Sequence, residues 1–140
     1  MQVPTATGRW LLTRSAKRKR WSGAMRLPGI WPMLRGEVWW VEFDPAVGSE
    51  ICKTRPAVIV SNDAANRNLA RVVVMPLTSN TGRQYPGEAV VTVGGQSSKA
   101  MADQIMAADK ARLKSQLGTL SKADMLAVED AIKIHLALPR

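Results

Sequence analysis

The stretch Arg55-Pro56-Ala57-Val58-Ile59-Val60-Ser61-Asn62 decides how the fold of this chain is predicted. Its centre, residues 56–60, is apolar at every position, which is typical of a central strand buried on both faces. An arginine opens this strand. A guanidinium stays charged near neutral pH and offers a planar fork of donors that suits phosphate. We therefore expect Arg55 to bind an anion where a rigid strand meets a loop, which makes phosphodiester chemistry the first hypothesis.

Four segments have the composition of β-strands, being rich in β-branched, aromatic and other apolar residues. They are residues 37–43, 56–60, 71–77 and 88–93. Polar or turn-rich connections separate them, at residues 46–54, 62–68 and 79–87. Residues 101–108 are compatible with either state, because Ala and Met favour a helix while the short length and the neighbouring strands favour another strand.

The last segment is predicted to be a helix that packs on the sheet. Ser121, with Asp124 three residues later, resembles a capping box at its start. Apolar residues then recur at helical spacing, namely Met125, Val128, Ile132 and Leu136. Several short strands followed by one terminal helix predict a mainly β, barrel-like domain.

The net charge of +9 is distributed unevenly along the 140 residues. Residues 1–32 hold seven basic residues and no acidic one, whereas residues 33–140 are nearly neutral. We predict a domain boundary near Pro32, with residues 1–32 a basic extension and residues 33–140 the folded domain. The extension is interpreted either as an addition upstream of a start at Met33 or as a basic arm that adds non-specific affinity for RNA.

Cysteine content and hydropathy narrow the class of protein. Cys52 is the only cysteine, which excludes an intramolecular disulfide and the usual Cys-rich zinc sites. No apolar run approaches the ~18–20 residues of a membrane span, and the N-terminal segment lacks the long apolar run of a signal peptide. We expect a cytoplasmic protein with no membrane association, no metal site and no cofactor.

An ordered set of short motifs resembles the MazF/PemK (Kid) toxins. In chain order the motifs are Arg35-Gly36-Glu37-Val38-Trp39, Phe43-Asp44-Pro45, Gly48-Ser49-Glu50, Arg55-Pro56-Ala57-Val58, Val60-Ser61-Asn62-Asp63, Pro76-Leu77-Thr78-Ser79, Tyr85-Pro86 and Ala102-Asp103-Gln104-Ile105. Each piece alone is a weak signal, but the ordered set is a strong one. The resemblance runs from about Met33 to the C-terminus and leaves residues 1–32 outside.

The resemblance implies both a fold and an activity. The family has an SH3-like barrel, shared with the CcdB gyrase poisons, which here would carry a C-terminal α-helix. Its members are cytoplasmic bacterial endoribonucleases of type II toxin–antitoxin systems. They act as homodimers, cut single-stranded RNA at short sequences without a metal, and are silenced by a cognate, MazE-like antitoxin. The expected products are a 2′,3′-cyclic phosphate and a 5′-hydroxyl.

Metal-independent RNA cleavage uses the neighbouring 2′-hydroxyl as nucleophile, so it needs proton transfer and stabilisation of a pentavalent phosphorane. The only histidine, His135, is predicted at the end of the terminal helix and is not assigned to this chemistry. The resemblance instead implies three catalytic residues, Arg55, Thr78 and Glu50. We expect Arg55 to stabilise the phosphorane, Thr78 to assist proton transfer, and Glu50 to act as the base or to position Arg55.

Six further residues are candidates for binding RNA. They are Ser79, Ser98, Gln104, Lys53, Arg83 and Tyr85. The resemblance places Ser98 and Gln104 where the family contacts bases, while Tyr85 and the Trp39-Trp40 pair are able to stack on them. Neighbouring residues of a strand point to opposite faces, so one tryptophan is expected inside and the other exposed.

Alternatives stay open both for the roles of single residues and for the function of the protein. Arg55 could instead form an ion pair with Glu50 or Glu88, and Thr78 could cap a turn. A noncatalytic gyrase poison of the CcdB type would share the fold without needing Arg55, Thr78 and Glu50 together. An RNA-binding module that relies on the basic arm would lose its function when residues 1–32 are removed.

Overall fold

The computed structural model describes residues 33–140, so the predicted basic extension lies outside the described residues. Strands dominate this part of the chain, with one short and one long α-helix and two 3₁₀ turns. In chain order the elements are β1 (Glu37–Glu42), β2 (Thr54–Ile59), α1 (Asp63–Asn68), β3 (Arg71–Thr78), β4 (Glu88–Val93), β5 (Gln96–Met101), η1 (Ala102–Gln104), β6 (Met106–Asp109), η2 (Lys110–Arg112), β7 (Leu113–Thr119) and α2 (Lys122–His135).

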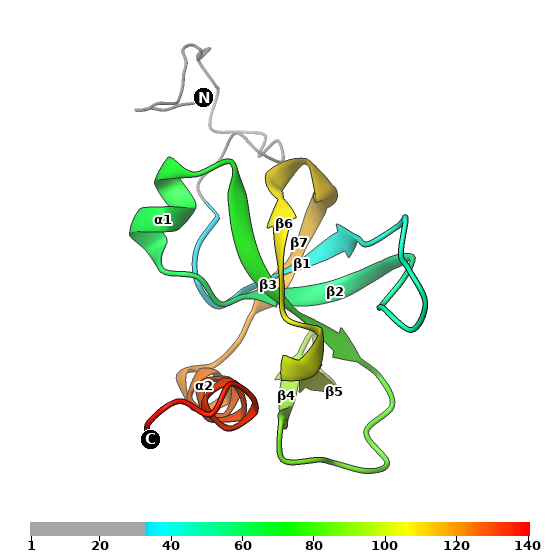
Figure 1. Cartoon of the computed structure of the whole chain (residues 1–140), viewed down its shortest axis with the longest axis vertical. Helices are drawn as coiled ribbons and strands as arrows, with labels where there is room; N and C mark the ends of the chain where they lie inside the picture. The colour runs from blue at the N-terminus through cyan, green and yellow to red at the C-terminus, as the bar shows by residue number, and fades with distance from the viewer. Residues whose placement is uncertain (1–32) are drawn as a thin grey trace.

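The strands form one antiparallel sheet that curls into a half-barrel (Figure 1). Its strand order is β4-β5-β3-β2-β1-β7, and β6 pairs with β3 off this path. β2 therefore lies at the centre, with β1 on one side and β3 on the other, as the apolar stretch 56–60 predicted. The mainly β fold with a C-terminal helix is confirmed.

β2 is buried on both faces because the sheet separates two clusters of apolar side chains. Val58 belongs to the cluster that β3, β4 and β5 form with α2. Ala57 and Ile59, on the opposite face of the same strand, belong to the cluster around Trp39. Burial of apolar surface on two sides is the main favourable term in folding and holds the strand rigidly. Arg55, at the start of β2, is thus carried on a fixed support.

A tight β4–β5 hairpin brings the far end of the sheet toward β7. Gly94 and Gly95 form its two-residue turn with φ angles of +61° and +75°, which favour glycine. β7 approaches this hairpin so closely that a Cβ on Gly118 would lie 3.0 Å from the Val93 side chain. The approach also sets Leu117 beside Gly94, and both residues line the pocket that contains Arg55.

α2 begins at the predicted cap and packs through the predicted stripe. The Ser121 hydroxyl accepts a hydrogen bond from the Asp124 amide at 3.1 Å. Val128 is fully buried, and Met125 and Ile132 pack against the same core cluster. Leu136, expected to continue the stripe, is half exposed because the helix ends one residue before it.

The Asp124 side chain departs from the capping box that its spacing suggested. Its carboxylate does not return to the helix start but accepts a hydrogen bond from the Thr92 amide of β4 at 2.9 Å. The contact ties α2 to the sheet, in agreement with the packing of α2 against β4 (Figure 1).

Three elements differ from the prediction. Residues 62–68, expected to be a polar break, contain α1, which the Asn62 side chain caps by accepting from the Ala65 amide at 2.8 Å. β5 and β7 were not expected because their sequences are polar. β7 is a strand at the sheet edge that buries only Leu113, while β5 buries a serine and a lysine. The ambiguous segment 101–108 divides into the end of β5, η1 and most of β6.

Candidate functional site

A pocket of about 290 Å³ lies where β1, the start of β2, the end of β3, the β4–β5 turn and β7 meet. Its lining includes four residues predicted to act on RNA, namely Arg55, Thr78, Ser79 and Ser98. They come from three different strands and one loop, so the curl of the sheet, rather than proximity in sequence, brings them together. The structure thus gathers the core of the predicted site around one cavity.

Arg55 lies at the second position of β2, opposite Val41 of β1, with an exposed side chain. Its Nε donates a hydrogen bond to the Cys52 carbonyl oxygen at 3.2 Å. Neither ion pair considered as its alternative role is formed, because Glu50 bonds within its own loop and Glu88 pairs with Lys99. The guanidinium is therefore oriented by the preceding loop while it borders the pocket.

Thr78 ends β3 and is half-buried. Its Oγ1 accepts a hydrogen bond from the Asn80 amide at 3.2 Å, which is the turn-capping contact considered as its alternative role. A hydroxyl that accepts in one bond still has its own proton to donate. The same side chain can therefore fix the turn and present a donor to the pocket.

The two adjacent tryptophans point to opposite faces of β1, as the strand period predicted. Trp39 is 1% exposed and donates from its indole nitrogen to Glu37 Oε1 at 2.9 Å. Trp40 is 37% exposed and lines the pocket with Arg55. An exposed indole beside a cationic group is suited to stack on an unpaired base.

Glu50 and Gln104, in contrast, lie around a second pocket of about 250 Å³ and do not line the first. Glu50 Oε1 accepts from the Val47 amide at 2.9 Å, and Gln104 Oε1 accepts from the Ile51 amide at 3.2 Å. The expected meeting of Arg55, Thr78 and Glu50 around one cavity is therefore not seen. The reason is that the loop preceding β2 uses both side chains to hold its own backbone.

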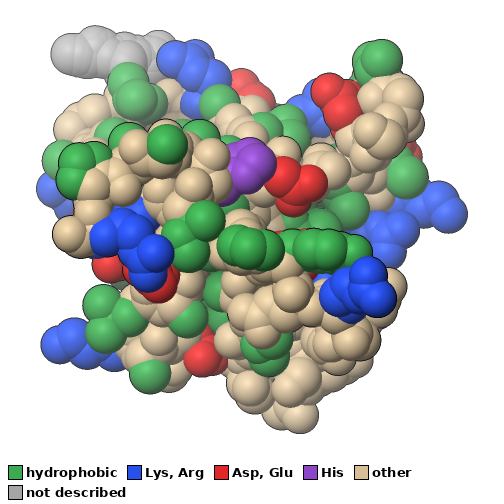
Figure 2. Space-filling view, turned by 60° about the horizontal axis from the view of Figure 1, so that its bottom comes forward, with side chains coloured by type: hydrophobic (Ala, Val, Ile, Leu, Met, Phe, Trp, Pro, Cys, Tyr) green, Lys and Arg blue, Asp and Glu red, His purple; other side chains and the backbone are tan. Residues whose placement is uncertain are grey.

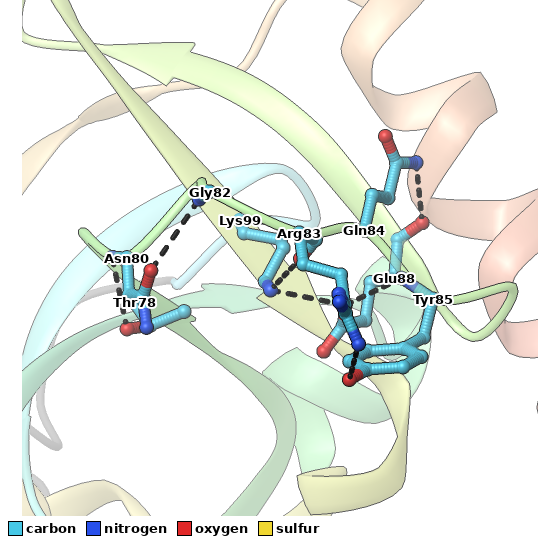
Figure 3. Close-up of polar contacts among 8 residues, drawn as sticks. All are labelled: Thr78, Asn80, Gly82, Arg83, Gln84, Tyr85, Glu88 and Lys99. Atoms are coloured by element: carbon cyan, nitrogen blue, oxygen red, sulfur yellow. Dashed lines mark hydrogen bonds and ion pairs between the residues drawn. The ribbon is translucent and has the colours of Figure 1, made fainter.

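The remaining RNA-binding candidates lie in loops outside the pocket lining. Lys53 is exposed in a left-handed conformation, with φ of +66°, and its amide donates to Asp44 Oδ1 at 2.9 Å. Arg83 and Tyr85 lie in the β3–β4 loop, where Arg83 Nη1 donates to the Tyr85 hydroxyl at 3.4 Å (Figure 3). Tyr85 is 54% exposed, so its ring is accessible from solvent.

The sequence pointed to residues 79–86 and 94–99 as segments that influence base preference, but it did not place Gly94, Gln96 or Leu117 in the pocket. Neither β5 nor β7 was expected, so nothing placed these positions beside β2. The Gly94-Gly95 pair was the one available signal, because two glycines favour a two-residue hairpin. Lys99 was missed as well, since its burial depends on a partner, Glu88, that only the strand pairing brings near.

On the face of the molecule in Figure 2, positive charge is spread out rather than gathered in one broad patch. In Figure 2 the Lys and Arg side chains lie at separate places around one face, with hydrophobic side chains between them. Because residues 33–140 are nearly neutral in sum, their attraction for a polyanion depends on local groups such as Arg55. His135, at the end of α2, packs beside Gly87 and is not part of the pocket lining.

No group of three or more His, Cys, Asp or Glu side chains within residues 33–140 could hold a metal ion. None of the helices described is both long enough and apolar enough to cross a membrane.

Comparison with known protein families matches residues 34–136 to the PemK-like, MazF-like toxin of type II toxin–antitoxin systems. Endoribonuclease MazF9 of Mycobacterium tuberculosis is 42% identical over 115 residues, which are 76% of this chain and 98% of that protein. Endoribonuclease toxin MazF of Escherichia coli is 31% identical over 100 residues, covering 71% of this chain and 89% of that protein.

Solved structures give the same likeness. An endoribonuclease in complex with its cognate antitoxin, from a mycobacterial species, matches with a TM-score of 0.66 and 30% identity over 77% of this chain and 98% of that one. MazF from Deinococcus radiodurans matches with a TM-score of 0.69 and 25% identity over 77% of this chain and 99% of that one. The half-barrel with its C-terminal helix is thus the fold of these proteins.

Proposed function

The chain belongs to the PemK-like, MazF-like toxins of type II toxin–antitoxin systems, and on this premise we propose that it cuts single-stranded RNA without a metal. It is an endoribonuclease of the MazF type. The observation that carries the proposed chemistry is the convergence of Arg55 and Thr78 on one pocket. A fixed cation and a hydroxyl donor at the same cavity suit a phosphate that becomes pentavalent during cleavage.

In the proposed reaction the 2′-hydroxyl next to the scissile phosphate gives its proton to solvent water while its oxygen attacks phosphorus, and water returns a proton to the leaving O5′, directly or through Thr78. The bond from phosphorus to O5′ then breaks, which leaves a 2′,3′-cyclic phosphate on one fragment and a protonated 5′-hydroxyl on the other. Arg55 keeps its proton throughout, so it donates hydrogen bonds to the equatorial phosphate oxygens rather than acting as a base. Thr78 donates its hydroxyl proton to a phosphate oxygen or relays a proton to the leaving O5′.

The RNA around the scissile bond is held by the other pocket residues. Trp40 offers an exposed indole face beside Arg55, and one stacked base contributes about 1–3 kcal/mol. Ser79 and Ser98 supply hydroxyls that can donate to or accept from a base edge or a phosphate. Single-stranded RNA fits this arrangement because its bases can be splayed out to meet an aromatic ring.

Glu50 and Gln104 act on the loop that precedes β2. Glu50 holds the Val47 amide, Gln104 holds the Ile51 amide, and the Cys52 carbonyl of the same loop orients Arg55. We therefore assign Glu50 a positioning role. Gln104 uses only its oxygen in this contact, so its amide donors are left for an RNA base that enters the second pocket.

Three further features come with the proposal, namely a homodimer, a cognate antitoxin of the MazE type and a cytoplasmic location. Exposed apolar side chains support the homodimer and the binding of an antitoxin, because these side chains are available for burial against a partner. They include Val90, Leu117 and Leu126. One matching structure is itself a complex with a cognate antitoxin.

The test is digestion of a transcript by the purified protein in EDTA, with analysis of the fragment ends. We expect cleavage to continue and to yield 5′-hydroxyl ends, which a polynucleotide kinase labels directly, together with 2′,3′-cyclic phosphates. Arg55→Ala should lower the cleavage rate by about a hundred- to a thousandfold, the usual effect of losing one preorganised donor. Its melting temperature should match that of the wild type, because the side chain is exposed.

The matched control is Arg67→Ala, which removes an exposed arginine from α1. This variant should cut as the wild type does. A wild-type protein that leaves RNA intact would instead support a gyrase poison or a passive RNA-binding module. Cleavage by Arg55→Ala at the wild-type rate would remove Arg55 from the mechanism.

A further inference from the structure

β5 contains a buried lysine that the proposed mechanism does not use. Lys99 is 6% exposed, and its Nζ lies 3.1 Å from Glu88 Oε1 in an ion pair whose two side chains are 8% and 14% exposed. Nζ also donates to the Arg83 carbonyl oxygen. Lysine is rarely buried unless it is paired, and a buried pair is weak evidence for stability on its own. We therefore considered what this pair holds in place.

The β3–β4 loop spans residues 79–87, and the pair fixes residues 83–85 in its second half (Figure 3). Lys99 holds the Arg83 carbonyl, and Glu88 Oε1 also accepts from the Tyr85 amide at 2.8 Å. Gln84 Nε2 donates to the Glu88 carbonyl oxygen at 3.0 Å. Three consecutive loop residues are thus attached to the start of β4 and to its neighbour β5.

The fixed segment carries an aromatic ring and a cation toward solvent. Tyr85 is 54% exposed, and its ring centroid lies 6.0 Å from both Arg83 Cζ and Lys99 Nζ. Arg83 Nη1 also donates to the Tyr85 hydroxyl at 3.4 Å. A planar ring able to stack on a base, next to a guanidinium able to hold a phosphate, is the combination that an unpaired nucleotide requires.

The segment is directly connected to the catalytic pocket. Lys99 is paired with Thr78 across the β3–β5 ladder, and Ser98, its neighbour in sequence, lines the pocket. The loop itself begins with Ser79, another lining residue, and its Asn80 amide donates to Thr78 Oγ1. RNA that places one phosphate at Arg55 and continues along this loop would meet Tyr85 and Arg83 next.

We propose that Arg83 and Tyr85 form a second nucleotide subsite beside the Arg55 pocket and that Lys99 is the positioning residue that holds it. The proposal rests on the proposed endoribonuclease function. It predicts that Lys99 acts on substrate binding and not on the chemical step, because it touches the loop backbone and not the pocket.

The test compares Lys99→Met with wild type on an RNA oligonucleotide that contains a mapped cleavage site. We expect KM to rise about tenfold, the effect of weakening one stacked base, while kcat stays close to wild type. Trimming the oligonucleotide one nucleotide at a time from either end should find a length at which the two proteins become equal. Lys114→Met is the matched control, because it removes an exposed lysine that pairs with Glu42 on the surface.

Two further variants separate positioning from simple stabilisation. Tyr85→Ala removes the ring without removing the ion pair, so combining it with Lys99→Met should give no greater rise in KM than Tyr85→Ala alone. Glu88→Gln removes the charge while keeping an oxygen for the Tyr85 amide, so it should raise KM as Lys99→Met does. Glu88→Gln also replaces Lys99→Met in the test if thermal melting shows that Lys99→Met does not fold.

The possible contrary results are distinct. The subsite is overturned if Lys99→Met, or Glu88→Gln in its place, has the KM of Lys114→Met. It is equally overturned by a fall in kcat at constant KM, or by full additivity with Tyr85→Ala. A wild-type protein that cuts no RNA would mean that the proposed function fails, which is distinguishable because it needs no variant.

Discussion

Glu50 holds the loop before β2 through the hydrogen bond that its carboxylate accepts from the Val47 amide. The same loop supplies the Cys52 carbonyl that orients Arg55. Through this loop the carboxylate can influence the direction of the guanidinium without contacting it. The sequence left two roles open for Glu50, base and positioning residue, and on these contacts we propose the positioning role.

Replacing Glu50 by two different residues tests this assignment. Glu50→Gln keeps an oxygen that can accept from the Val47 amide, so cleavage should remain close to wild type. Glu50→Ala removes the acceptor and loosens the loop, which should lower the cleavage rate by about tenfold, as expected for a lost hydrogen bond of about 1–1.5 kcal/mol. Steady-state cleavage assays decide between the roles: a Glu50→Gln protein as slow as Arg55→Ala would make Glu50 the base.

The positions of Arg55 and Thr78 at strand ends follow from the apolar pattern of the strands, whereas the roles given to both residues come from the family resemblance. The apolar run 56–60 places Arg55 at the start of a buried strand, and Pro76-Leu77-Thr78 ends the next strand in the sheet. Glu50 and Gln104 lie outside regular strands. Their direction depends on local backbone contacts, such as the left-handed Lys53, that no periodic pattern reveals.

At the level of elements, the contact between the β4–β5 hairpin and β7 closes one wall of the pocket. Gly118 allows this contact, because any side chain there would press on Val93. Leu117 precedes Gly118 and Gly94 follows Val93, and both of these neighbours line the pocket. The spacing between β4 and β7 therefore sets the shape of the site.

Gly118→Val should widen this spacing and destabilise the fold. We expect the free energy of unfolding to fall by about 1–3 kcal/mol, as for overpacked cores, with a loss of cleavage activity. Urea unfolding gives the first quantity and an RNA cleavage assay the second. The control is Thr119→Val on the same strand. The side chain is exposed there, so the free energy of unfolding and the cleavage activity should both stay at the wild-type level. Wild-type stability in Gly118→Val would show that the strands have room to spare.

The strands that could be predicted are the ones whose own residues are buried. β1, β2, β3 and β4 have apolar or alternating sequences, and each was found close to its expected position. β5 and β7 obtain their structure from pairing with neighbours rather than from their own hydrophobic pattern. A polar strand of this kind is recognised only after its partners are placed.

At the scale of the whole molecule, the described residues 33–140 contain both the pocket that Arg55 lines and the pocket that Glu50 lines. The seven basic residues of residues 1–32 account for most of the net charge of +9. We therefore propose that residues 33–140 carry the cleavage activity and that residues 1–32 add most of the non-specific attraction to RNA. Residues 33–140 alone should keep the cleavage activity and lose most of the non-specific attraction to RNA.

A protein consisting of Met33–Arg140 should cut RNA at the same sites as the full chain. Its affinity for RNA without a cleavage site should be lower and should depend less on salt, because fewer phosphates are neutralised. Cleavage mapping and filter binding at several salt concentrations measure the two properties. A truncated protein that folds but no longer cuts would assign the activity to the basic arm.

The central claim is that Arg55 stabilises the phosphorane through the fork of its guanidinium. The most direct measurement is the single-turnover cleavage rate of Arg55→Lys and Arg55→Ala beside wild type, at saturating protein. We expect the cleavage rate of Arg55→Lys to lie between those of wild type and Arg55→Ala, because an ammonium keeps the charge and loses the two-point contact. Equal rates for wild type and Arg55→Ala would contradict the claim.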